Sequence, residues 1–317
     1  GLSQKNSLLV IVPRNSNFLS LFSNNKIKNK KNIKIIFVPT YQIKNHNFII
    51  RGISELFMSY ILWYKAKDII VKFNPSSMLV YSPSIFFGYF CKELKKNFKI
   101  KSVCILRDLF PYWAIDVGYI KNIFIKKILN KIFANFLLHF DSIGLESRSN
   151  IKILKSKFDL KYFYLPNWVN LKNFKPNKFK NKKKLDFIFA GNIGGGQDIE
   201  KVLFFMKSIP KEKLNKFYLV GDGINLFKIN AENLINLKDK IIIKRKLNQK
   251  KYINFLNKID IGIVSLNDKI KSVNFPGRLF SYLMANKPVI LLSKKNNELS
   301  RYIEINKIGV KSSNVKL

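Results

Sequence analysis

The chain has 317 residues, which is long for one ordinary domain and suits two, each large enough to bury its own core. Hydrophobic residues make up 47% and aromatic residues 14% of the sequence, which argues against an intrinsically disordered chain. The formal net charge of +39 predicts polyanionic partners, but the few arginines are scattered among lysine, asparagine, isoleucine and phenylalanine, so we expect a membrane surface or phosphorylated substrates and no nucleic acid.

Short apolar runs alternate with amphipathic segments in the first half of the chain. The runs favour buried parallel strands, and the segments between them are long enough for crossover helices. The expected strands are 8–12, 33–38, 78–81, 100–106, 142–145 and 162–165, and the expected helices are 49–73, 85–96 and 121–138. This alternation predicts a doubly wound, Rossmann-like α/β domain over residues 1–166. The lysine runs at 26–31 and 178–184 are typical of solvated loops.

Residues 167–184 predict a linker, because their composition changes and no sustained period of 2 or 3.6 is present. Strand signals then return at 185–190, 217–220, 240–243, 259–265 and 288–292. We therefore predict a second doubly wound domain over residues 185–317. Ligands of open parallel sheets bind beyond the carboxyl ends of the strands, so two such domains would face each other across a cleft.

A glycine-rich loop follows the first strand of this second domain. It contains Gly191, Asn192, Gly194 and Gly195, and a helix is expected to begin near residues 197–198. Glycines let the backbone approach a phosphate closely, and a helix amino terminus presents unpaired N–H groups. A flexible strand-to-helix turn would have the same composition. The spacing differs from the dinucleotide fingerprint, which disfavours a nicotinamide enzyme.

Two further segments predict ligand contacts at the same edge of the sheet. The next strand ends at Gly221 and Asp222, where a plain hydrophilic turn is the alternative. Pro276, Gly277 and Arg278 open a helix expected over 279–285, and a cation at a helix amino terminus suits a diphosphate. The alternative for Arg278 is one more solvated base.

Taken together, these segments resemble the donor-binding half of glycosyltransferase family 4, the GT-B enzymes of bacterial polysaccharide and glycolipid assembly. The likeness lies in the order and spacing of 189–196, 219–223 and 275–290, and in 165–170, which is similar to the family's interdomain "LPNGVD". Residues 107–111, with Gly118, resemble the "DLWPES…LG" stretch of members that act on lipid-linked sugars.

The resemblance implies a metal-independent, retaining transfer of a hexose-type sugar from a nucleoside diphosphate donor, with uridine the commoner base, to a glycan or lipid-linked acceptor. No resident cofactor is expected. The first domain would bind the acceptor, with Asp108 as the candidate catalytic residue, whose alternative is a turn or capping role. In the second domain Arg245 and Lys246 would join Arg278 around the leaving diphosphate, and Ser281 stands at the ribose-contact position.

The chain departs from the family at two positions. Val273 and Ser281 stand where two glutamates often flank the donor, so a catalytically silent GT-B protein that binds nucleotide sugars is the alternative function. Family members also continue into helices that return to the first domain, and we expect such helices to be missing after Leu317.

Three observations bear on location and metals. Only two cysteines are present and no run reaches roughly 18 uninterrupted apolar residues, so we expect a cytoplasmic protein without a spanning helix or signal peptide. No spacing of His, Cys or acidic residues is typical of a metal site. Lysines interleave with apolar residues over 113–138 and recur over 92–101, which predicts peripheral attachment to the inner, anionic face of the cell membrane. Ordinary crossover helices are the alternative.

Overall fold

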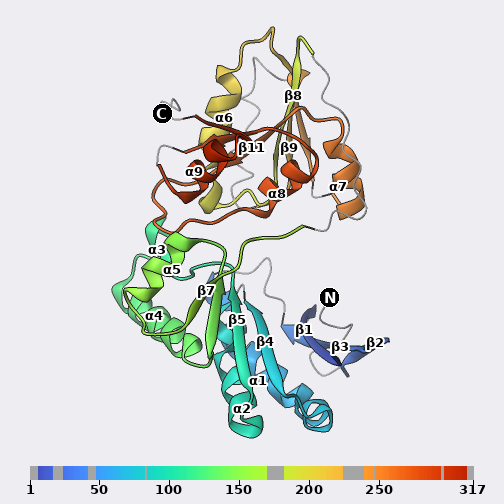
Figure 1. Ribbon diagram of the computed structural model, residues 1–317, viewed down its shortest axis with the longest axis vertical. Coiled ribbons are helices and arrows are strands. Elements are labelled where there is room, and N and C mark those ends of the chain that lie inside the picture. The colour runs from blue at the N-terminus through green and yellow to red at the C-terminus, as the bar shows by residue number, and fades with distance from the viewer. Residues whose placement is uncertain are drawn as a thin grey trace. The chain divides into compact units, whose positions relative to one another are not determined.

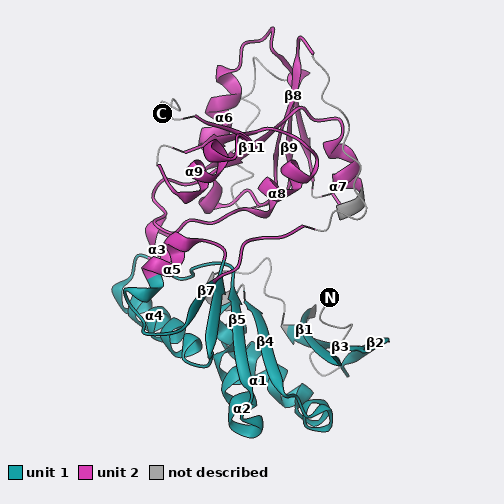
Figure 2. Cartoon of the chain, in the orientation of Figure 1, with its two compact units in different colours: residues 1–111, 121–145, 154–163 teal, residues 112–120, 146–153, 164–317 magenta. Residues whose placement is uncertain are grey.

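The chain divides into two compact units (Figure 2). The computed structural model describes residues 6–16, 24–41, 48–82, 84–169, 182–223, 239–245, 247–293 and 296–312. The first unit contains residues 1–111, 121–145 and 154–163, and the second contains 112–120, 146–153 and 164–317. Two segments that precede residue 166 therefore belong to the second unit. Of the predicted linker, residues 170–181 lie outside the described residues.

The first unit has two sheets among its described residues. β1 (Leu8–Ser16) pairs in parallel with β3 (Ile33–Tyr41), and β3 pairs in antiparallel with β2 (Lys26–Lys30). The four-stranded sheet has the order β4 (Ser77–Ser82), β5 (Lys101–Leu106), β6 (Ser142–Leu145) and β7 (Tyr162–Tyr164). The helices are α1 (Phe48–Phe73), α2 (Gly88–Phe98), preceded by a 3-10 turn (Ile85–Phe87), and α4 (Ile123–Leu137).

The prediction of a solvated loop at 26–31 was wrong for most of that segment. Every residue of β2 is exposed, yet its backbone pairs with β3 from Lys26 opposite Phe37 to Lys30 opposite Ile33. Backbone hydrogen bonds of an edge strand tolerate a charged, exposed sequence, and lysines on an edge discourage further pairing. The apolar pattern that identifies buried strands is absent there.

The second unit is built on one parallel sheet (Figure 1). Its strands are β8 (Leu185–Ala190), β9 (Leu214–Val220), β10 (Ile241–Lys244), β11 (Ile261–Ser265), β12 (Val289–Leu292) and β13 (Gly309–Ser312), in the order β10-β9-β8-β11-β12-β13. The five strands predicted here are confirmed. The short strand β13 was not predicted, because three of its four residues are polar or glycine.

Helices cover both faces of this sheet. α6 (Ile199–Ser208) packs on the face that carries Phe187 and Phe189, whereas α7 (Gln249–Leu256), α8 (Gly277–Met284) and α9 (Glu298–Ile305) pack on the face that carries Ile188. Successive strand residues point to opposite faces, so continuous apolar strands fill two cores at once. Two short helices, α3 (Tyr112–Asp116) and α5 (Arg148–Lys155), lie earlier in the sequence. No helix among the described residues is both long and apolar enough to cross a bilayer.

Tyr282 of α8 contacts strand β8 through its hydroxyl group. Its ring is fully buried, and a side chain at Gly262 of β11 would collide with it. Its hydroxyl accepts a hydrogen bond from the Ala190 N–H at 3.0 Å and lies 3.4 Å from the Ile188 carbonyl, to which it donates. The tyrosine thereby satisfies backbone groups next to the loop that follows β8.

We predict that Tyr282→Phe destabilises the second unit by about 1–3 kcal/mol, because a buried N–H loses its acceptor. The matched control is Tyr302→Phe, at a partly buried tyrosine of the same apolar cluster. Urea unfolding followed by far-ultraviolet circular dichroism measures both. Equal midpoints for the two variants would contradict the assigned role of the Tyr282 hydroxyl.

Candidate functional site

The loops after β8, β9 and β10 continue the backbone pairing of the sheet past its carboxyl edge. Gly191 N–H donates to the Val220 carbonyl at 2.8 Å, and Gly221 N–H donates to the Lys244 carbonyl at 2.9 Å. Ile193 N–H in turn donates to the Asp222 carbonyl at 3.0 Å. The glycine-rich loop is therefore built on a fixed backbone frame.

Glycine is required in this frame for steric reasons. Gly191 and Gly221 have φ values of +121° and +152°, which L side chains rarely adopt. A Cβ atom at Gly221 would overlap the Gly191 carbonyl, and one at Gly223 would overlap the backbone of Ile193. The two loops thus pack backbone against backbone, which leaves an edge lined by peptide groups.

Arg278 lies beneath this edge. Its guanidinium is 4.5 Å from the ring centre of Phe189, and a Cβ atom at Gly191 would be 2.8 Å from its Nη2. Nη1 is shielded from solvent and has no hydrogen-bond partner. Burial lowers the pKa of Arg278, while the phenols of Tyr282 and Tyr252 act in the opposite direction. An arginine nevertheless keeps its charge in proteins, so this site holds a cation.

No carboxylate balances that charge within the described residues. None of the ion pairs found there includes Arg278; they join Lys95, Lys182 and Lys201 to aspartates. Arg278 is the second residue of α8, which follows the N-cap Pro276. The Leu279 N–H donates to the Pro276 carbonyl at 2.9 Å, so the N–H groups of Gly277 and Arg278 are the backbone donors at this helix end. The arrangement can therefore bind an anion with both a guanidinium and backbone donors.

The other predicted site residues take different places. Asn192 and Gly277 are exposed, Gly194 is buried beside the Asn192 side chain, and Gly195 lies against Tyr119. Asp222 and Arg245 are exposed at the ends of β9 and β10. The Ser281 hydroxyl donates to the Gly277 carbonyl at 3.3 Å, within its own helix. Lys246 lies outside the described residues, and Asp108 follows β5 in the first unit.

Comparison with known proteins identifies one curated relative but no matching family model. The chain is 23% identical over 278 residues to the probable glycosyltransferase WbjE of Pseudomonas aeruginosa. This match covers 82% of the present chain and 67% of WbjE.

Solved structures match most of the chain. The sucrose-phosphate synthase of Thermosynechococcus elongatus superposes with a TM-score of 0.73 at 12% identity, over 98% of this chain and 76% of that one. The chain has the GT-B fold. The E. coli trehalose-6-phosphate structure bound with UDP-2-fluoro glucose superposes with a TM-score of 0.66 at 9% identity, over 98% of this chain and 82% of that one. WaaG, a glycosyltransferase involved in lipopolysaccharide biosynthesis, superposes with a TM-score of 0.59 at 13% identity, over 90% of this chain and 74% of that one.

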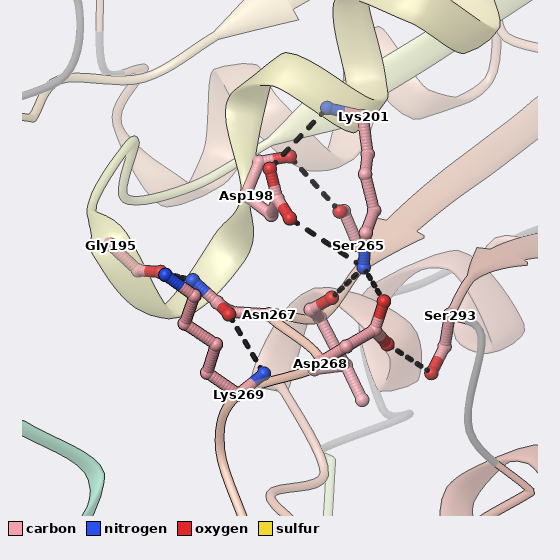
Figure 3. Close-up of polar contacts among 9 residues, drawn as sticks. Gly195, Asp198, Lys201, Ser265, Asn267, Asp268, Lys269 and Ser293 are labelled. Carbon is pink, nitrogen blue, oxygen red and sulfur yellow. Dashed lines mark hydrogen bonds and ion pairs between the residues drawn. The ribbon is translucent and has the colours of Figure 1, made fainter. Parts of the chain in front are cut away.

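An ion pair of the buried Lys201 fixes the start of α6, directly after the glycine loop of this GT-B chain, to the segment that follows β11 (Figure 3). The side chain of Lys201 in α6 is 2% exposed, and its Nζ lies 2.5 Å from Asp268 Oδ2 and 2.8 Å from the Leu266 carbonyl. Asp198, the N-cap of α6, lies 3.6 Å from the same Nζ. Asp268 also accepts a hydrogen bond from Ser293 at 3.3 Å.

The end of β11 and the segment after it also donate hydrogen bonds to carbonyl groups of the glycine loop (Figure 3). Asn267 Nδ2 donates to the Gly195 carbonyl at 2.8 Å, and Ser265 Oγ donates to the Asp198 carbonyl at 3.2 Å. The Asn267 N–H donates to the Gly196 carbonyl at 3.1 Å. The carbonyls of Gly195, Gly196 and Asp198 thus accept hydrogen bonds from the protein itself, and these bonds fix the conformation of the loop without a ligand.

Sequence reasoning missed this network. The one local signal is Asp198 three residues before Lys201, a spacing that many exposed helix turns share. Asp268 is distant in sequence, and nothing in the periodicity of α6 marks one of its lysines as buried.

We predict that Lys201→Met destabilises the second unit by about 3 kcal/mol or more, because it leaves the carboxylate of Asp268 without its buried partner. Lys207→Met is the matched control, since Lys207 is exposed on the same helix. Thermal and urea unfolding test both variants. A Lys201→Met protein as stable as the control would show that this ion pair does not hold the loop.

Proposed function

We propose that this chain is a glycosyltransferase that binds the diphosphate of a nucleotide sugar at the carboxyl edge of the second sheet. The observation that carries the proposal is the uncompensated guanidinium of Arg278 beneath Gly191. A shielded guanidinium nitrogen that makes no hydrogen bond is costly, so a site that keeps one suits an anionic ligand. Both the curated relative and the WaaG structure are glycosyltransferases by name, which supports the activity.

The finer assignment follows the resemblance to glycosyltransferase family 4. We propose a hexose-type sugar on a nucleoside diphosphate, with uridine as the first base to test, since one similar structure holds UDP-2-fluoro glucose. A glycan or lipid-linked acceptor in cell-surface polysaccharide assembly is supported by the role named for WaaG. No resident cofactor is needed for this reaction.

The proposed chemistry breaks the bond between the anomeric carbon and the diphosphate oxygen and forms one to an acceptor hydroxyl oxygen. Negative charge then grows on the leaving diphosphate. Arg278, the first N–H groups of α8 and the exposed Arg245 would stabilise that charge, with Lys246 as a further candidate. We propose that these groups take the place of a metal ion, that the sugar keeps its anomeric configuration, and that Asp108 orients the acceptor hydroxyl or takes its proton.

We predict that Arg278→Ala weakens binding of a nucleotide sugar and of its free nucleoside diphosphate by about 1.5–3 kcal/mol, because a charge-assisted hydrogen bond to phosphate is lost. Arg278→Lys should retain part of the affinity, since it keeps the charge and loses the planar fork. Calorimetry against uridine, guanosine, adenosine and thymidine diphosphates measures the effect.

The matched control is Arg301→Ala, because Arg301 is exposed on α9 of the same unit. Its affinity should equal that of the unmodified chain. An Arg278→Ala protein with unchanged affinity for every nucleoside diphosphate that the unmodified chain binds would remove Arg278 from the site.

A nucleotide-sugar-binding protein without catalysis is the second candidate function. Val273 is buried, and the hydroxyl of Ser281 is bonded within its helix, so neither glutamate position of the family supplies a carboxylate. Nucleoside diphosphate release in the presence of a glycan or lipid-linked acceptor separates the two. Binding without release across a donor and acceptor panel would favour the second candidate.

We also propose that the first unit docks on an anionic membrane surface through α4. Phe124, Ile128 and Leu138 are 70%, 58% and 65% exposed, and the exposed Lys127 and Lys131 fall on the same helical stripe. The opposite face is buried by Phe133, Phe136 and Leu137. A stripe that combines exposed apolar side chains with lysines, on a helix without any acidic residue, suits the interface of an anionic bilayer.

We predict that Lys127→Gln with Lys131→Gln lowers partitioning onto vesicles containing phosphatidylglycerol by about thirtyfold, since each lysine near such a surface adds about 1 kcal/mol. Lys207→Gln with Lys211→Gln, two exposed lysines of the second unit, is the control. Co-sedimentation at low salt with anionic and with phosphatidylcholine vesicles measures both. Equal binding to the two lipids, or none to either, would contradict the proposal and favour a soluble acceptor.

A further inference from the structure

Side chains hold the segment of residues 273–275 that leads into α8. Asn150 of α5 is 2% exposed and binds both backbone groups of one residue: its Oδ1 accepts from the Val273 N–H at 2.8 Å, and its Nδ2 donates to the Val273 carbonyl at 2.9 Å. A neighbouring strand would satisfy the same two groups. The primary amide of Asn150 therefore acts as a one-residue strand partner.

A second set of side-chain hydrogen bonds, here called the second grip in contrast to the first grip of Asn150 on Val273, holds the backbone of Phe275. Glu146, 4% exposed, accepts from the Phe275 N–H through Oε1 at 2.8 Å and from Asn167 Nδ2 through Oε2 at 2.8 Å. Asn167 Nδ2 also donates to the Phe275 carbonyl at 2.7 Å. Val273 and Phe275 are two residues apart, so the two sets of hydrogen bonds hold alternate residues of the same short segment.

The chemistry of the second grip requires a carboxylate. Both protons of Asn167 Nδ2 are already directed, one to Glu146 and one to the Phe275 carbonyl. A glutamine at position 146 would turn an N–H group toward that donor or toward the Phe275 N–H. Rotating the Asn167 amide would instead place its oxygen against the Phe275 carbonyl. Only a carboxylate, in which both oxygens accept hydrogen bonds, can bind the Asn167 amide and the Phe275 N–H at the same time.

The elements that carry these grips are themselves anchored. Glu298, in the first turn of α9, accepts from the N–H groups of Arg148 and Ser149 at 2.9 and 2.7 Å and from the Ser147 hydroxyl at 2.8 Å. Burial alone would raise the pKa of Glu298, but these hydrogen bonds outweigh it and lower the pKa below its ordinary value. The carboxylate thus fixes the amino terminus of α5 by the rule that anions favour that end of a helix.

We propose that Glu146, Asn150 and Asn167 are positioning residues that hold Arg278 ready for the diphosphate. The inference rests on the proposed function. Arg278 follows Phe275 by three residues and makes no ion pair within the described residues that could fix it. Packing on Phe189 and the contacts of Tyr282 fix part of its position, and the backbone before α8, which Asn150 and Glu146 hold, fixes the rest. A group held in place before binding loses less entropy when the ligand arrives.

The test measures affinity for inorganic pyrophosphate, which needs no knowledge of the base or the sugar. Glu146→Gln should weaken pyrophosphate binding about tenfold, as expected when a buried charged hydrogen bond is replaced by two facing donors. The same change in an Arg278→Ala background should have almost no further effect, because a positioning residue acts only through the group that it positions. Glu304→Gln, at an exposed carboxylate of α9, is the matched control.

Asn150→Asp provides a second variant should Glu146→Gln fail to fold, since it places an oxygen against the Val273 carbonyl. It should give the same loss of affinity and faster amide exchange at Val273. A full loss in the Arg278→Ala background, or unchanged affinity in a folded variant whose Val273 or Phe275 amide exchanges faster, would overturn the positioning role alone. Absence of pyrophosphate and nucleoside diphosphate binding by the unmodified chain would instead overturn the proposed function.

Discussion

The candidate site depends on a half-buried cation, Arg278, whose Nη1 is shielded from solvent and which has no ion-pair partner among the described residues. Arg278 packs on Phe189, under a loop that must be glycine at position 191 to make room for it. Folding alone gives no benefit for burying Nη1 without an acceptor, because a buried donor that makes no hydrogen bond costs free energy. The neighbouring features are consistent with one explanation, in which a phosphate oxygen completes the pairing.

Hydrogen bonds and ion pairs from other parts of the second unit hold two segments of the site in place, the glycine loop and the segment before α8. The glycine loop is fixed by Lys201, Asp268 and Asn267, while the segment before α8 is fixed by Glu146 and Asn150. In both places buried charged or amide side chains bind backbone groups, which leaves the outer surface of the loops free for a ligand. Such preorganisation is what electrostatic stabilisation of a leaving group requires.

The sequence was informative where a residue type has one main physical reason to be present. Apolar runs predicted β6 and β8 to the residue. The glycines at 191 and 221 marked the two loops at the carboxyl edge of the sheet, where the structure packs one loop backbone against the other, while the predicted approach to a phosphate stays a prediction. The sequence was uninformative where a side chain's role depends on distant partners. The lysines of β2 and Lys201 have the same local appearance, yet the former are exposed on an edge strand and the latter is buried in an ion pair. Glu146 and Asn150 likewise resemble ordinary polar residues near the start of a helix until Phe275 is placed beside the first and Val273 beside the second.

Hydrogen–deuterium exchange with and without nucleotide sugars tests the central claim most directly, because it locates the ligand as well as detecting it. Uridine, guanosine, adenosine and thymidine diphosphate sugars would each be added at saturating concentration. The account predicts that at least one slows exchange at residues 191–198 and 276–280, the glycine loop and the start of α8, and that Arg278→Ala abolishes this protection. Protection by a nucleotide sugar confined to other segments, or none from any of the four, would contradict it.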